Sequence, residues 1–203
     1  GQIRQTGDER FGYDAYRRFI QLFGKVALAI PDDLFDKQFE MVKHKVGVKE
    51  DLDLSATHLK EISERFLKVV EEYTGKPFPA EPFDQLEIAI KAVFNSWMGR
   101  RAVDYRRQFN ITPDMANGTA VNVVTMVFGN RGDDSATGVA FTRNPGTGEN
   151  KLFGEYLVNA QGEDVVAGIR TPKPIDHLAS EMPRIAQELE ELCAKLETHY
   201  KEI

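Results

Sequence analysis

The first half of the chain carries apolar residues at the spacing of amphipathic helices. Apolar side chains recur at i, i+3 and i+4, which places them on one face of a helix. This pattern predicts helices over 16–30, 34–42, 59–73 and 86–97. The aromatic residues in these stripes are more typical of a helical core than of a cofactor pocket, so we expect residues 1–99 to form a helical region.

Capping and turn-forming residues mark the ends of these helices. Pro31 is followed by two acids, which suits the first turn of a helix. Ser55 is a favourable N-cap for the helix that follows it. Gly47 and Gly75 stand where helices commonly end on a glycine.

From Gly118 to Gly168 the apolar residues follow the period of strands, and glycines occupy most corners. Strands are predicted over 121–128, 139–142 and 152–158, with a short fourth at 165–166. Two interpretations fit such a meander. It forms an ordinary antiparallel sheet, or its glycine-rich corners let backbone N–H groups approach a phosphorylated ligand.

The C-terminal part returns to a helical pattern. Residues 170–174 contain two prolines and are predicted to be extended. A helix is expected from Asp176 to Tyr200, with a break near Pro183. The patterns together predict an α+β fold, in which a helical region precedes a small, mainly antiparallel sheet with packed helices.

Composition excludes several classes of protein. The 203 residues include 26 basic and 32 acidic ones, giving a net charge of −6, which argues against a nucleic-acid partner. No apolar run approaches transmembrane length and no signal peptide is evident, so we expect no membrane association. Cys193 is the only cysteine, which excludes an intramolecular disulfide. The expected location is cytoplasmic.

Positive charge is concentrated at Arg100, Arg101, Arg106 and Arg107. Guanidinium groups match phosphate geometry, so these arginines could form an electropositive wall for a triphosphate. Alternatively, they lie on a solvated helix and pair with nearby acids. We favour the second interpretation, because arginine pairs are common on helix surfaces.

Three long sequence words carry a family resemblance: GTAVNVVTMVFGN, TGVAFTRNP and GEYLVNAQGEDVVAG. In this order and spacing they resemble the ATP-grasp domain of the pyruvate phosphate dikinase family. The similarity continues upstream through YDAYRRFIQLFG, DQLEIAIKAVFNSW and RAVDYRR and downstream through RTPKPI, so it covers almost the whole chain.

The resemblance implies a partial ATP-grasp domain, in which nucleotide lies between two α+β lobes. Residues 1–99 would be a helical subdomain inserted in the first lobe. Residues 100–127 would be a connection and the strand that crosses into the second lobe. Residues 128–203 would be most of that second lobe.

The resemblance also implies nucleotide-binding residues. Thr125, Met126 and Val127 on the crossing strand would read the adenine edge through their backbone, and Met126 offers a soft apolar surface. Thr137 and Gly138 would lie beside the nucleotide. From the residues alone, Gly138 could equally be a structural turn residue.

Magnesium accompanies the triphosphate in this family, and three acids are candidate ligands. Glu155, Glu163 and Asp164 would hold Mg²⁺, which offsets charge on the phosphate oxygens. The alternative is that Glu155 faces water from a strand and Asp164 belongs to a turn. Gln161 could contact phosphate or close the same turn.

The family converts ATP, phosphate and pyruvate to AMP, diphosphate and phosphoenolpyruvate through a phosphohistidine on another domain. The chain begins without methionine, so we expect it to be cut from a larger protein. The resemblance implies that this parent protein is a homo-oligomer. The further nucleotide-binding elements, the phosphohistidine domain and the pyruvate domain would lie elsewhere in that protein. The chain alone is therefore expected to be non-catalytic.

Two alternatives to this interpretation remain. The chain is a piece of pyruvate, water dikinase or a related phosphotransferase, or it is a non-catalytic nucleotide-binding or interaction module.

Overall fold

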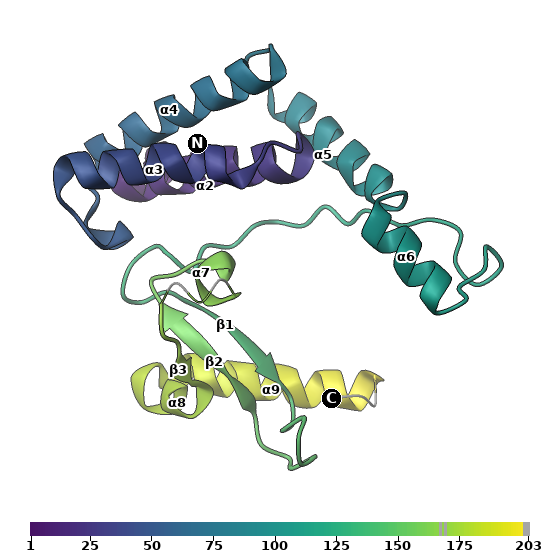
Figure 1. The fold of residues 1–203 in the computed structure, drawn as a ribbon. Coiled ribbons are helices and arrows are strands. Elements are labelled where there is room, and N and C mark those ends of the chain that lie inside the picture. Colours follow the sequence, from purple (N-terminus) through teal and green to yellow (C-terminus); the bar gives the residue numbers. More distant parts are fainter. Residues whose placement is uncertain (167, 169, 201–203) are drawn as a thin grey trace. The chain divides into compact units, whose positions relative to one another are not determined.

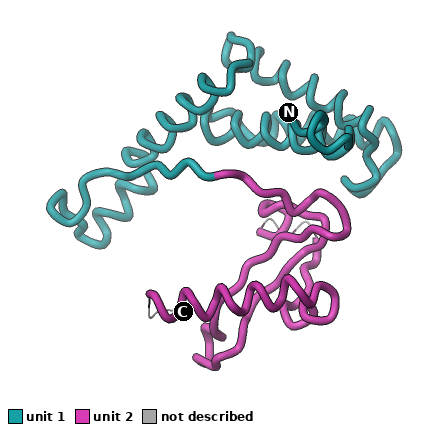
Figure 2. The backbone as a smooth tube through the Cα atoms, turned by 180° about the vertical axis from the view of Figure 1, so that it is seen from behind, with its two compact units in different colours: residues 1–124 teal, residues 125–203 magenta. Residues whose placement is uncertain are grey.

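The computed structural model describes residues 1–166, 168 and 170–200, and the chain divides into two compact units (Figures 1 and 2). The first unit comprises Gly1–Val124 and the second Thr125–Ile203. The division falls inside the segment that was predicted to be the crossing strand.

The first unit is helical, as its apolar periodicity predicts. Its elements are α1 (Gln2–Thr6), α2 (Glu9–Ala27), α3 (Asp32–Val46), η1 (Asp51–Asp53), α4 (Ala56–Thr74), α5 (Pro82–Ser96) and α6 (Arg100–Gln108). The predicted caps are confirmed. The Ser55 hydroxyl accepts the His58 backbone N–H at 3.3 Å, and Gly47 and Gly75 end their helices with φ of 76° and 70°.

The core of the first unit lies among α2, α3 and α4. Phe35 and Phe66 are fully buried and pack edge to face, with ring centroids 5.1 Å apart. The rest of this core is aliphatic, and all of it except Leu54 comes from the predicted stripes: Ile20, Ile30, Val42, Leu54, Leu59, Ile62, Val69 and Val70. Burial of these apolar side chains is the main stabilising contribution to the unit.

A buried charge network joins α2 to the segment around η1. Arg17 and Arg18 each donate to the Asp14 carboxylate, at 2.8 and 3.1 Å. Arg10 donates to the backbone carbonyls of Asp51, Leu52 and Leu54, and so ties this turn to α2. Burial alone would raise the pKa of Asp14, but the two neighbouring arginines hold it below its ordinary value.

The second unit is a small sheet with helices. Its elements are β1 (Ala136–Phe141), β2 (Phe153–Val158), α7 (Gly162–Val166), β3 (Lys173–Pro174), η2 (Ile175–His177), α8 (Leu178–Glu181) and α9 (Pro183–Tyr200). The strands are antiparallel in the order β1-β2-β3. The strands predicted over 139–142 and 152–158 are confirmed, and so is the helix break at Pro183.

Tyr156 of β2 is the centre of the second unit's core. It packs with Ile175, Leu178 and Ala186, so α8 and α9 cover one face of the sheet (Figure 1). Its hydroxyl donates to Glu181 at 2.9 Å. Burial raises the pKa of Tyr156 to about 12, and the hydrogen bond to Glu181 adds to this effect.

Two predicted strands are wrong. Residues 121–128 have no regular secondary structure, and Val124 and Val127 are 80% and 83% exposed. A strand needs a neighbour for its backbone N–H and C=O groups, and no strand lies beside this segment in the described part of the protein. Residues 165–166 are helical because they continue α7, whose first turn is capped by a side chain.

The described residues thus form an α+β fold with a small antiparallel sheet. Its assignment to the ATP-grasp class stays a prediction. Among the described helices, none combines the length and the apolar character that crossing a bilayer requires.

The Asp14 network makes a testable prediction about acid stability. Because the folded-state pKa of Asp14 is lowered, its stabilisation is fully present above the ordinary value of 3.8 and is lost as pH falls through the folded-state value. Asp14→Asn should destabilise the first unit by about 3 kcal/mol at neutral pH, because it leaves two arginines facing a neutral amide. Urea unfolding between pH 7 and pH 3 measures both effects, and the variant should show a flatter acid dependence.

Glu64→Gln is the matched control, because Glu64 is an exposed acid in the middle of α4. It should leave stability within about 0.5 kcal/mol. Equal losses of unfolding free energy in the two variants would show that the network contributes nothing beyond the effect of one negative charge.

Candidate nucleotide site

The candidate site begins where the backbone enters the sheet of the second unit. The carbonyl of Gly129 accepts the Ala160 backbone N–H at 2.9 Å, and the carbonyl of Ala160 accepts the Thr137 hydroxyl at 2.7 Å. A side chain at position 129 would collide with Thr137 and Ala160 and would lie 2.6 Å from the Ala136 carbonyl oxygen. Glycine is therefore required here, and residue 129 is held next to the start of β1 and the end of β2. Residues 125–127 come shortly before this junction in the chain.

Thr125, Met126 and Val127 precede this anchor and lie outside regular structure. Met126 is 65% exposed, so its thioether side chain is open to a ligand. No backbone hydrogen bond joins these three residues to another described residue. Their N–H and C=O groups are therefore free to bind the edge of a base.

Gln161 and Asp164 are buried at the start of α7. The Asp164 carboxylate accepts the Gln161 backbone N–H at 2.9 Å, an arrangement that resembles half of a capping box. Both residues are less than 10% exposed, at 7% and 6%. Because the carboxylate is used in this hydrogen bond, a structural role is favoured for Asp164. This agrees with the alternative that Asp164 belongs to a turn.

The register of the strands divides the sheet into two faces. Residues directly opposite one another share a face, so Gly138 lies with Tyr156 on the face that α8 and α9 cover. Thr137 and Leu157 share the other face, where Leu157 packs with Ala160 and with Val165 of α7.

Beyond Leu157, no described element of the second unit covers this second face. We call it the open face; it consists of Val139, Phe141, Phe153 and Glu155. Its three apolar side chains are 44–47% exposed. The sequence did not predict Val139, Phe141 and Phe153 as site residues. The signal that could have found them is their alternation with small residues along β1 and β2.

Gly138 has a structural reason to be glycine. A side chain there would lie 2.7 Å from the Glu155 carbonyl oxygen and 2.9 Å from the Tyr156 Cβ. The missing side chain therefore points toward the covered face rather than the open one. This placement favours the interpretation of Gly138 as a structural residue.

The candidate metal ligands are not brought together as a cluster. Glu155 lies on the central strand β2 and Glu163 on α7, and both are exposed. Among the described residues, no group of three or more His, Cys, Asp or Glu is placed to hold a metal.

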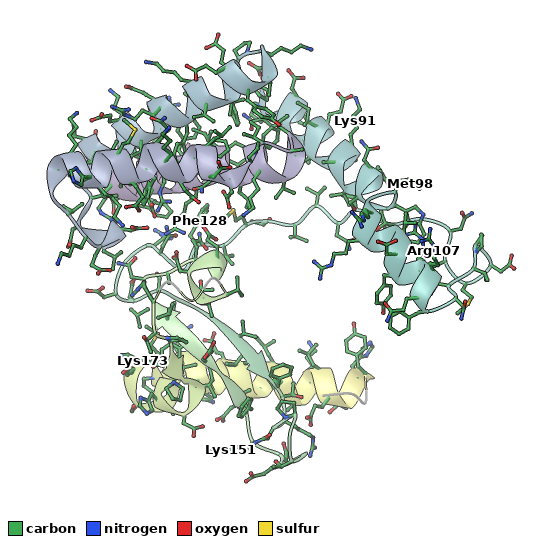
Figure 3. All side chains as sticks on the ribbon, viewed as in Figure 1. Lys91, Met98, Arg107, Phe128, Lys151 and Lys173 are labelled. Carbon is green, nitrogen blue, oxygen red and sulfur yellow. The ribbon has the colours of Figure 1, made fainter. Side chains whose placement is uncertain are left out.

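The arginines of α6 belong to the first unit, where Arg107 is visible on the helix (Figure 3). Arg106 stacks on Trp97, 4.0 Å from the ring centroid, and donates to its carbonyl at 2.8 Å. Arg100 and Arg107 flank Asp104 at 3.7 and 3.6 Å. These contacts support the interpretation that the arginines lie on a solvated helix and pair with nearby acids.

A groove of about 630 Å³ lies elsewhere on the second unit, between the β1–β2 connection and the helices α8 and α9. Lys151 of that connection (Figure 3) forms an ion pair with Asp176 at 2.8 Å on its rim. None of the sequence-predicted site residues lines this groove. The groove and the candidate nucleotide site are therefore different places.

Comparison with known proteins identifies the family. The family model described as "Pyruvate phosphate dikinase, AMP/ATP-binding domain" matches residues 35–202. The chain is 58% identical to the pyruvate, phosphate dikinase of Entamoeba histolytica over 200 residues, which are 98% of this chain and 23% of that protein. It is 52% identical to the Clostridium symbiosum enzyme over 204 residues, covering 100% of this chain and 23% of the relative. It is 54% identical to pyruvate, phosphate dikinase 1, chloroplastic, of Oryza sativa subsp. japonica over 203 residues, covering 100% and 21%.

The chain therefore belongs to the family of the pyruvate phosphate dikinase AMP/ATP-binding domain. It spans less than a quarter of the length of these three relatives.

Gly138 provides a test of the strand packing. Gly138→Ala should lower the free energy of unfolding of the second unit by about 1–3 kcal/mol, because the added methyl group meets backbone of β2. Val139→Ala is the matched control on the open face and should cost less than about 1 kcal/mol. Hydrogen exchange of the β2 amides reports on this unit directly. Unchanged exchange in Gly138→Ala would contradict the close approach of the two strands.

Proposed function

We propose that this chain is part of the ATP-binding domain of a pyruvate, phosphate dikinase. The parent protein would convert ATP, phosphate and pyruvate to AMP, diphosphate and phosphoenolpyruvate. The phosphoryl group would pass through a histidine on another domain of the same protein. Support comes from the family match and from relatives that are named pyruvate, phosphate dikinases.

Within the second unit, we propose that nucleotide binds between residues 125–127 and the open face. The observation that carries this proposal is the anchor at Gly129, which ties the chain to the sheet directly after an exposed segment whose backbone groups bond to no described residue. The open face supplies the second, apolar surface. A purine needs both kinds of surface, since its edge forms hydrogen bonds and its rings favour apolar contact.

Each part of this site would have its own role. Backbone N–H and C=O groups of Thr125, Met126 and Val127 would bind the adenine edge. The Met126 thioether and the rings of Phe141 and Phe153 offer polarizable apolar surface to the base or ribose. Thr137 and Gln161 are partly or fully buried, and their contribution would be to hold the turn beside the phosphates.

Mg²⁺ would accompany ATP, and two of the predicted acids fit it better than the third. Mg²⁺ is usually bound by one or two carboxylates together with substrate phosphates and water. Exposed Glu155 and Glu163 can take this role, whereas the Asp164 carboxylate already caps α7. The ion would offset the phosphate charge, and the two glutamates would orient it.

The remaining partners follow from the proposed parent activity. They are the phosphohistidine domain and the phosphoenolpyruvate/pyruvate domain of the same longer protein. The homo-oligomeric state stays a prediction. The cytoplasmic location also stays a prediction, because one relative is named chloroplastic. Pyruvate, water dikinase is the less favoured alternative, since the reported relatives carry the phosphate-using name.

Proline substitution tests backbone recognition of the base. Thr125→Pro, Met126→Pro and Val127→Pro each remove one N–H from an exposed segment outside regular structure, so the fold should survive. We expect the unmodified protein to bind Mg-ATP weakly, with a Kd of about 1 mM or about −4 kcal/mol. At least one proline variant should weaken this binding at least fivefold in an NMR titration.

Alanine at the same three positions is the matched control, because it keeps the N–H. The alanine variants should bind within about twofold of the unmodified protein, apart from Met126→Ala, which also removes the apolar surface. Equal binding by all three proline variants would overturn the proposed role of this backbone. Micromolar binding by the unmodified protein would contradict the expectation that further nucleotide-binding elements are needed.

A further inference from the structure

The step Asn117-Gly118 stands out chemically in the segment between α6 and β1. It is the only Asn-Gly step among the 203 residues. Both residues are exposed and outside regular structure. In the described part of the protein the Gly118 N–H donates no hydrogen bond, and open space surrounds the position where a Gly118 side chain would stand.

An exposed and unhindered Asn-Gly step meets the requirements for attack of the glycine backbone nitrogen on the asparagine side-chain amide. The backbone nitrogen of Gly118 can form a bond to the Asn117 Cγ, and the bond between this Cγ and the amide Nδ2 then breaks with loss of ammonia. Water opens the resulting succinimide at either carbonyl and gives aspartate or isoaspartate. Glycine favours the ring closure because it has no Cβ to hinder the approach of its nitrogen.

Asparagines elsewhere in the sequence lack this combination. The nitrogen after Asn110 belongs to Ile111 and donates to the Arg106 carbonyl at 2.9 Å, and the nitrogen after Asn159 belongs to Ala160 and donates to Gly129. Asn144 precedes a proline, which has no N–H.

Asn122 is the closest internal comparison. It is also exposed and lies in the same irregular segment. It is followed by Val123, whose β-branched side group hinders the backbone nitrogen.

We propose that Asn117 is a site of spontaneous deamidation and isomerisation. Each event changes the net charge from −6 to −7. The isoaspartyl product also inserts one extra carbon atom into the backbone, shortly before residues 125–127. The site thus gives the protein a time-dependent modification at the segment that enters the second unit.

The test is to incubate the folded protein at mildly alkaline pH and map its peptides by mass spectrometry over time. The peptide with Asn117 should gain about one dalton. It should also become a substrate for a protein-isoaspartate methyltransferase with labelled S-adenosylmethionine. Asn122 should convert at least tenfold more slowly. Asn117 conversion no faster than that of Asn122 would overturn the proposal.

Two glutamine variants complete the experiment. Asn117→Gln should abolish most of the isoaspartate signal, because the extra methylene group makes the product of attack a less favourable six-membered ring. Asn122→Gln is the matched control and should leave the signal unchanged. An isoaspartate signal that survives in Asn117→Gln would place the modification elsewhere and contradict the assignment.

Discussion

The close approach of backbone at Gly129 determines how the second unit is arranged. Two backbone carbonyl groups and the Thr137 hydroxyl crowd this position, so only glycine fits there. The hydrogen bond from Ala160 to Gly129 and that from Thr137 to Ala160 join the entering segment, the start of β1 and the end of β2. Residues 125–127 lead into this junction, so the proposed nucleotide site depends on it.

The same register explains why the two faces of the sheet differ. Gly138 and Tyr156 are opposite one another, and the small size of Gly138 lets Tyr156 pack beneath β1 and reach Glu181. On the other face α7 covers only the end near Leu157. The face left over carries Phe141, Phe153 and one carboxylate, which is the mixed character of a ligand-binding surface.

Local signals predicted most of the fold. The helical stripes, the Ser55 cap, the two main strands and the break at Pro183 all depend on neighbouring residues. The strand over 121–128 was predicted wrongly because a strand also depends on a partner, which the sequence of the segment does not reveal. The candidate site was harder to predict from the sequence than the fold, because the burial of Asp164 and the exposure of Val139 and Phe141 on the open face follow from tertiary packing.

The most direct test of the account is to map Mg-ATP onto the protein by NMR chemical-shift perturbation. Binding at the proposed site should shift the amides of residues 125–127 and of the open face, including Phe141 and Glu155, with smaller shifts at Gln161 in the anchoring turn. Shifts confined to α2–α4, or to the groove beside α8 and α9, would contradict it. Such a result would show that the exposed segment and the open face do not form a nucleotide site.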